Sequence, residues 1–143
     1  MPSDVTPLPA RLTAFFGACP EVAAAYLFGS HARGEAAPHS DIDVAIVLAS
    51  DRPKAPGAAL SWYRLELLAD LVAILHREDV DLILLEQAPP VLAQRVIAEG
   101  VLLKDADPRQ RVALEERILH RYVDTAPLRR AQWDAFRKRL EAG

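Results

Sequence analysis

Residues 26–43 read YLFGSHARGEAAPHSDID, and two features of this stretch decide the fold. An apolar run ends in Gly29 and Ser30, and after ten further residues Asp41 and Asp43 flank a single isoleucine. Two carboxylates this close repel each other and are costly to remove from water. A strand that carries both therefore indicates a cation or a substrate that offsets this cost.

Three short apolar runs predict strands in and after this stretch. They are bounded by glycine, proline or polar residues and cover residues 23–29 (AAAYLFG), 41–49 (DIDVAIVLA) and 80–86 (VDLILLE). The second run has apolar side chains on both faces, which is typical of a strand in the middle of a sheet. Residues 101–104 (VLLK) are a short apolar segment to which the pattern assigns no regular structure.

Apolar side chains at helical spacing predict helices between and after the strands. These helices cover residues 8–18, 60–77 and 89–99, and two more follow in the tail, from 108 to about 123 and from about 125 onwards. Residues 50–59 contain two prolines and a glycine, so we expect a mobile loop there.

The order of these elements predicts an α/β (α+β) fold: a small mixed sheet with helices packed on one face, plus a helical C-terminal extension. We expect residues 1–105 to form the domain and residues 106–143 to form the extension, within the same compact unit. A length of 143 residues with a hydrophobic fraction of 51% suffices for one core.

The charge is divided unevenly between these two parts. Residues 1–105 carry 8 basic and 14 acidic side chains, whereas residues 106–143 carry 9 basic and 6 acidic ones. The basic extension is either a solvated helical surface or a surface that binds a partner. The acidic domain lacks the basic footprint of nucleic-acid binding, so we expect no direct contact with nucleic acid.

The single cysteine, Cys19, excludes a disulfide framework and favours a reducing compartment. The first ten residues, MPSDVTPLPA, lack the basic and apolar regions of an export signal. No apolar segment approaches the roughly 18 residues that span a bilayer. We therefore expect a cytoplasmic protein without a membrane anchor.

The polar residues of the opening stretch suit chemistry on phosphate. Side chains two apart on a strand share a face, so Asp41 and Asp43 point the same way, and Asp81 would join them from a neighbouring strand. Mg²⁺ takes oxygen ligands, usually one or two carboxylates and the phosphates of a substrate. Gly29 and Ser30 offer backbone N–H groups and a hydroxyl to a phosphate. Together these groups indicate transfer at phosphorus assisted by two Mg²⁺ ions.

These residues also carry a family resemblance. The pattern Gly29-Ser30, ten residues, Asp41-Ile42-Asp43 resembles the signature of the nucleotidyltransferase superfamily with the DNA polymerase β type of palm, and Asp81 matches its third carboxylate. The longer forms LFGSHARGEA and SDIDVAIVL resemble the minimal nucleotidyltransferases (MNT), the antitoxins paired with HEPN toxins. The tail resembles the C-terminal extension of the MntA-like subgroup. The resemblance covers about residues 8–141.

The resemblance implies an activity, a partner and site residues. Members of this subgroup transfer AMP from ATP, with Mg²⁺, to a tyrosine hydroxyl of the cognate HEPN ribonuclease toxin and so silence it, within a complex of the two proteins. By position, Asp41 and Asp43 would bind both metal ions. Asp81 would bind the ion at the attacking hydroxyl and help to remove its proton. Gly29 and Ser30 would hold the triphosphate, and Arg33 would contact a phosphate or the toxin.

Two other readings stay open at this point. The chain could be a non-enzymatic antitoxin that neutralises its toxin by binding, with the basic tail as the grip. It could also transfer a nucleotide to a small molecule such as an aminoglycoside, although about 38 residues of tail leave little room for the extra domain that such enzymes usually carry.

Several other residues have simpler interpretations. We expect His31 and His39 to be exposed loop residues rather than metal ligands, since Mg²⁺ prefers oxygen. Trp62 and Trp133 are interpreted as packing residues, and Trp133 alone could instead anchor a protein interface.

Overall fold

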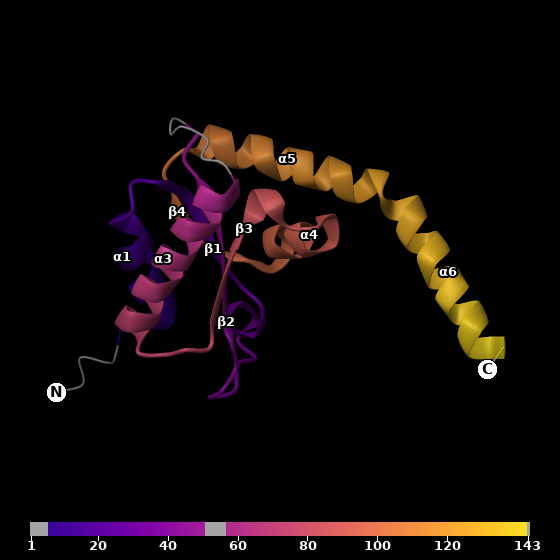
Figure 1. Ribbon diagram of the computed structural model, residues 1–143, viewed down its shortest axis with the longest axis horizontal. Helices are drawn as coiled ribbons and strands as arrows, with labels where there is room; N and C mark the ends of the chain where they lie inside the picture. Colours follow the sequence, from indigo (N-terminus) through magenta and orange to yellow (C-terminus); the bar gives the residue numbers. More distant parts are fainter. Residues whose placement is uncertain (1–5, 51–56, 143) are drawn as a thin grey trace.

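The computed structural model describes residues 6–50 and 57–142, which form a four-stranded sheet with helices around it (Figure 1). The strands are β1 (Val22–Phe28), β2 (Ile42–Leu48), β3 (Val80–Leu84) and β4 (Val101–Asp105). The helices are α1 (Leu8–Gly17), α2 (Ser30–Arg33), α3 (Gly57–Leu75), α4 (Pro90–Glu99), α5 (Pro108–Asp124) and α6 (Ala126–Ala142), with a 3₁₀ turn η2 (Leu85–Gln87).

The sheet is mixed, with the strand order β3-β2-β1-β4. β1 runs antiparallel to both β2 and β4, whereas β2 and β3 are parallel. A parallel pair needs a long crossover, which α3 supplies between β2 and β3. β2 lies inside the sheet, which confirms the prediction for residues 41–49. The mixed α/β class is likewise confirmed.

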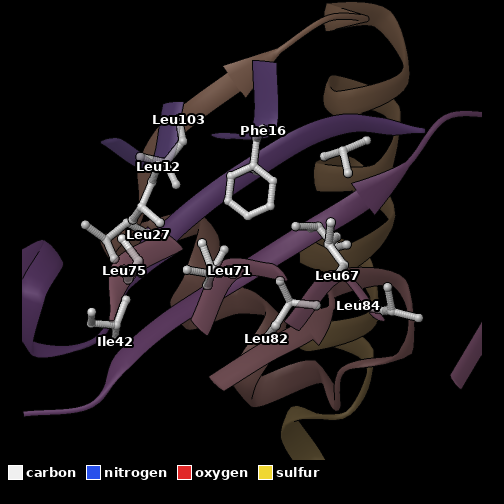
Figure 2. Close-up of a cluster of buried hydrophobic side chains, with 14 residues drawn as sticks. Leu12, Phe16, Leu27, Ile42, Leu67, Leu71, Leu75, Leu82, Leu84 and Leu103 are labelled. Carbon is white, nitrogen blue, oxygen red and sulfur yellow. The ribbon is translucent and has the colours of Figure 1, made fainter. Parts of the chain in front are cut away.

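Helices cover both faces of the sheet, so the prediction of helices on one face is wrong. One core lies between the sheet and helices α1 and α3 and includes Leu12, Phe16, Leu27, Ile42, Leu71 and Leu82 (Figure 2). A second core lies on the opposite face, under α4 and α5, and includes Tyr26, Phe28, Val47, Val96, Leu114 and Ile118. The reason is that every residue of β1 is buried, so each face of the sheet needs its own cover.

Side-chain hydrogen bonds join helices on both faces of the sheet to the strands. Lys104 of β4 donates from Nζ to the carbonyls of Phe16 and Cys19, at 2.9 and 2.8 Å, which joins the C-terminal end of α1 and the residues after it to the edge strand. At the start of α5, Gln110 donates from Nε2 to the carbonyl of Leu48 at 2.8 Å. The extension is therefore joined to the end of β2, the strand that begins at the acidic motif.

Helix α6 continues from α5 after a bend and stands away from the sheet (Figure 1). Arg129 holds the bend, because its Nη2 donates to the carbonyl of Tyr122 at 2.8 Å and its guanidinium lies 4.0 Å from the centre of the Tyr122 ring. None of the described residues of α6 is buried. The interpretation of both tryptophans as packing residues is wrong, since Trp62 is 68% exposed and Trp133, on α6, is 58% exposed.

A few boundaries differ from the sequence-based expectations. Residues 101–104 belong to an edge strand, β4, because β1 offers them a free hydrogen-bonding edge. Residues 30–33, where His31 was expected in a loop, form the short helix α2. The loop expected at 50–59 lies outside the described residues at 51–56, and α3 already begins at Gly57. Within the described ranges, no helix combines the length and the apolar character needed to cross a bilayer.

Candidate active site

Asp43 and Asp81 lie directly opposite each other in the parallel pairing of β2 and β3. Paired residues of neighbouring strands point to the same face of a sheet. For this pair it is the face covered by α4 and α5, because the next residues, Val44 and Leu82, belong to the opposite core. On its other side Asp43 pairs with Phe28, the last residue of β1. The register therefore places two carboxylates side by side where β1 ends.

The third predicted acid, Asp41, lies one residue before β2 and is exposed, as is Asp81, whereas Asp43 is half-buried. Burial raises the pKa of Asp43, and the negative charges of Asp81 and Asp41 raise it further. The positive charges of His31 and Arg33 act in the opposite direction. All three carboxylates thus influence one another electrostatically, and burial together with the neighbouring charges disfavours the ionised form of Asp43.

Gly29 lies at the junction of β1 and α2, close to the side chain of Asp43. Its φ of 72° lies in the region that favours glycine. A Cβ at this position would stand 2.4 Å from Oδ2 of Asp43, too close for any side chain. Ser30 follows as the first residue of α2 and is half-buried. The backbone of the Gly-Ser pair is therefore held next to the acidic pair.

The donor set suits a hard cation that a substrate completes. Among the described residues, no three His, Cys, Asp or Glu side chains are placed together as a ready-made metal site. Mg²⁺ does not need such a cage, because it is usually held by one or two carboxylates together with the phosphates of its substrate. Asp43 and Asp81, side by side with Asp41 nearby, match that smaller requirement in ligand type and number.

Arg33 lies near this site but is engaged with acidic side chains. Its Nε donates to Glu35 at 3.0 Å and its Nη1 to Glu99, at the end of α4, at 3.4 Å. His39 is exposed, as expected, whereas His31 is half-buried in α2 and its Nε2 lies 3.1 Å from the carbonyl of Ser40. The expectation of an exposed loop residue at position 31 is therefore wrong.

Sequence reasoning assigned no role to Arg77 and Asp79, which lie between α3 and β3 beside the acidic pair. The only local signal is a run of charged residues, RED, directly before the apolar strand. Such a run is more often a solvated turn, so the pattern alone could not identify them.

The fold and this geometry agree with one protein family. Residues 11–109 match the family model described as polymerase beta, nucleotidyltransferase. The chain belongs to the polymerase β nucleotidyltransferase family. The match spans all four strands and includes Gly29, Ser30 and the three aspartates. No curated protein sequence matches this nucleotidyltransferase significantly.

Several solved structures resemble the nucleotidyltransferase over almost its whole length. One, described as a toxin–antitoxin with AMP-PNP, is 27% identical with a TM-score of 0.73, over 91% of this chain and 98% of the other. A toxin–antitoxin MntA-HepT structure is 26% identical with a TM-score of 0.65, over 90% and 95%. A third structure is described as tri-AMPylated Shewanella oneidensis HEPN toxin in complex with MNT antitoxin. The matching chain is 26% identical with a TM-score of 0.64, over 90% of this chain and 94% of the other.

Proposed function

We propose that this nucleotidyltransferase is the antitoxin of a HEPN toxin–antitoxin pair of type VII, and that in the cytoplasm it transfers AMP from ATP to a tyrosine hydroxyl of its toxin. The observation that carries the proposal is the pairing of Asp43 with Asp81 directly beside Gly29. The similar solved structures support the choice of reaction and partner, since one contains an ATP analogue and another an AMPylated HEPN toxin with an MNT antitoxin.

The proposed reaction is an in-line displacement at the α-phosphorus of ATP. The tyrosine oxygen forms a bond to that phosphorus, and the bond from the phosphorus to the oxygen bridging the α- and β-phosphates breaks. Pyrophosphate leaves with the bonding electrons, and the hydroxyl proton passes to Asp81. Gly29 and Ser30 hold the triphosphate through backbone N–H groups and a hydroxyl. Glycine at position 29 lets the backbone lie close to Asp43, so these donors stand next to the carboxylates.

Two Mg²⁺ ions complete this proposal. Asp41 and Asp43 would hold both ions, and Asp81 would hold the one nearer the attacking hydroxyl. When bound, such ions stabilise the charge on the attacking and leaving oxygens. The carboxylates in turn need a cation, because burial and mutual repulsion disfavour three negative charges at this edge of the sheet. Arg33 is a further candidate for contact with a phosphate or with the toxin.

The form of α6 favours a protein as acceptor and keeps a second function open. The helix has no buried residue and exposes Trp133, Phe136 and Leu140, three to four positions apart along one side. Exposed aromatic clusters of this kind are typical of protein interfaces. A grip through α6 would serve AMP transfer and would equally serve neutralisation by binding alone, so the two functions need an experiment that separates them.

The fate of the individual phosphates of ATP makes that separation. The toxin is incubated with this chain, Mg²⁺ and ATP labelled either in the α- or in the γ-phosphate. We expect label from the α-phosphate on the toxin and label from the γ-phosphate in released pyrophosphate. Asp43→Asn should abolish transfer, whereas Asp70→Asn, which changes an exposed aspartate on α3, should not. Tight binding of the toxin without transfer of either label would reject the enzyme and favour neutralisation by binding.

A further inference from the structure

The backbone carbonyl of Ser40 joins three parts of the site. It accepts a hydrogen bond from Nη2 of Arg77 at 2.7 Å and lies 3.1 Å from Nε2 of His31. A carbonyl oxygen only accepts, so the hydrogen bond requires a proton on Nε2 of His31. Ser40 directly precedes Asp41, and His31 directly follows Ser30. One carbonyl oxygen therefore connects the acidic strand start to the helix that begins with Ser30.

Arg77 extends this connection to the segment that leads into Asp81. Its Nε donates to Oδ1 of Asp79 at 2.8 Å, while the carbonyl of Asp79 accepts from the backbone N–H of Ile42 at 2.8 Å. Asp79 lies two residues before Asp81, and Ile42 lies between Asp41 and Asp43. The guanidinium of Arg77 thus bridges the segment just before β2 and the segment just before β3. This bridge adds to the backbone hydrogen bond from Ile42 to Asp79, which already joins the two segments.

We propose that Arg77 is a positioning residue that sets the separation of Asp41 and Asp43 from Asp81 by clamping Ser40 to Asp79. The inference rests on the proposed function only in assigning these carboxylates to a divalent cation and ATP. In this account Arg77 acts through Ser40 and Asp79, to which its Nε and Nη2 groups donate, and does not itself contact the substrate.

The geometry of the clamp requires arginine. Two donors of one planar group must reach a carbonyl and a carboxylate that belong to different segments, and the fork of a guanidinium offers both in a fixed arrangement. Lysine carries the same charge on one nitrogen at the end of a flexible stem, and it lacks the planar fork that holds the carbonyl and the carboxylate in a fixed relation to each other. The side chains of Arg77 and Asp79 are 29% and 31% exposed, so water competes only in part for this bridge.

The charges around Arg77 agree with a structural role. The hydrogen bond to Asp79 raises the pKa of Arg77, and the nearby charge of Asp41 acts in the same direction. The hydrogen bond from Arg77 in turn lowers the pKa of Asp79. The guanidinium of Arg77 is therefore held by the carboxylate of Asp79 and the carbonyl of Ser40, and its positive charge lies near Asp41.

The test measures cation binding directly, without the toxin. Mn²⁺ replaces Mg²⁺, and free Mn²⁺ is followed by electron paramagnetic resonance while the full chain is titrated in the presence of a non-hydrolysable ATP analogue. We expect Arg77→Lys to weaken Mn²⁺ binding about tenfold, the loss typical of residues that orient metal ligands. The matched control is Arg11→Lys, which changes an arginine whose Nη2 donates to the carbonyl of Ile74 on α3, at 3.2 Å, and it should bind Mn²⁺ like the wild type.

A second variant, Asp79→Asn, keeps the proposal testable if Arg77→Lys unfolds the chain, which circular dichroism would reveal; a folded Asp79→Asn chain that binds Mn²⁺ like the wild type would then overturn the proposal. Asp79→Asn keeps the shape of the side chain and removes the charge that holds the guanidinium, so it should weaken Mn²⁺ binding severalfold. In a folded double variant, the two losses should be less than multiplicative, because both break one clamp. Multiplicative losses, or Mn²⁺ binding by Arg77→Lys within twofold of the wild type, would overturn the proposal.

The outcome separates this inference from the proposed function. A wild-type chain that binds Mn²⁺ with the ATP analogue, loses binding on Arg77→Lys and yet never modifies the toxin would reject AMP transfer and support the clamp. A wild-type chain that modifies the toxin, with Arg77→Lys binding Mn²⁺ normally, would reject the clamp alone. A wild-type chain that binds no Mn²⁺ at all would overturn it as well.

Discussion

The backbone of Gly29 lies against the carboxylate of Asp43, so closely that a Cβ on Gly29 would stand 2.4 Å from Oδ2. This contact joins the two halves of the motif that the sequence separates by ten residues. A side chain at position 29 must displace either the carboxylate or the Gly-Ser backbone, and both belong to the proposed site.

We therefore expect Gly29→Ala to reduce AMP transfer by about 100-fold or more, since a displacement of roughly 1 Å in a reacting site has that effect. The matched control is Gly17→Ala, because an added Cβ at Gly17 meets no atom of the described residues within 4 Å. Single-turnover rates of toxin modification provide the measurement. A Gly29→Ala chain that transfers AMP at the control's rate would show that the close contact is irrelevant to catalysis.

Removal of divalent cations should separate catalysis from toxin binding. With EDTA, AMP transfer should cease, because Asp41, Asp43 and Asp81 are then left without the cation that offsets their repulsion. Binding of the toxin through α6 should persist, since that helix exposes apolar and basic side chains and needs no metal. Parallel assays of transfer and of co-purification, with Mg²⁺ restored as the control, check both halves of this prediction.

Truncation of the aromatic pair on α6 should weaken toxin binding and leave the fold intact. Trp133 and Phe136 have ring centres 5.7 Å apart and exposed fractions of 58% and 47%. Each change to alanine should cost about tenfold or more in affinity, as at interface hot spots, but alter the free energy of unfolding by no more than about 0.5 kcal/mol. Leu128→Ala is the control, since Leu128 is equally exposed on another side of the helix. Calorimetric titration with the toxin would contradict the account if all three variants bound it alike.

The hydrogen bond between Tyr26 and Glu115 should stabilise the packing of α5 on the sheet. Tyr26 Oη donates to Glu115 Oε2 at 2.9 Å, and Arg111 donates to the same carboxylate at 3.1 Å. Tyr26→Phe should lower the free energy of unfolding by about 1 kcal/mol, the usual value of one such bond. Urea unfolding at pH 7 measures the difference, and an unchanged midpoint would show that the bond contributes nothing.

The same tyrosine predicts a dependence of stability on alkaline pH. Burial and the bond to Glu115 raise the pKa of Tyr26 above its ordinary value of 10.0. The folded chain therefore retains this proton at a pH where the unfolded chain has lost it, so the contribution of Tyr26 is complete below pH 10 and declines as the pH rises beyond it. The decline in the free energy of unfolding between pH 9 and 11 should be shallower in Tyr26→Phe. Parallel slopes for the two chains would contradict this assignment.

Local patterns in the sequence were sufficient for the parts of the fold that depend on neighbours in the chain. The Gly-Ser pair and Asp41 and Asp43 follow from one stretch, because strand periodicity fixes which side chains share a face. Asp81 was predicted from its place in a strand, and the register between β2 and β3 places it opposite Asp43. Their roles in catalysis stay predictions until transfer is measured.

The remaining features depend on contacts between distant segments. The strand β4 forms because one edge of β1 is open to pairing. The sequence of residues 101–104, VLLK, does not reveal that such an edge is available to them. The Ser40 carbonyl that receives Arg77 is a backbone group, so no residue type marks it. The apolar side of α6 has the spacing of a packed helix, and only its position in the fold shows that nothing in the described chain covers it.

Intact-mass spectrometry of the cognate HEPN toxin is the measurement that tests the central claim most directly. The toxin is incubated with this chain, ATP and Mg²⁺, beside a reaction with Asp43→Asn, and modified peptides are then sequenced. The account predicts that the toxin gains one or more AMP units on tyrosine, and that the Asp43→Asn reaction leaves its mass unchanged. A toxin that binds the wild-type chain tightly and keeps its original mass would contradict the account.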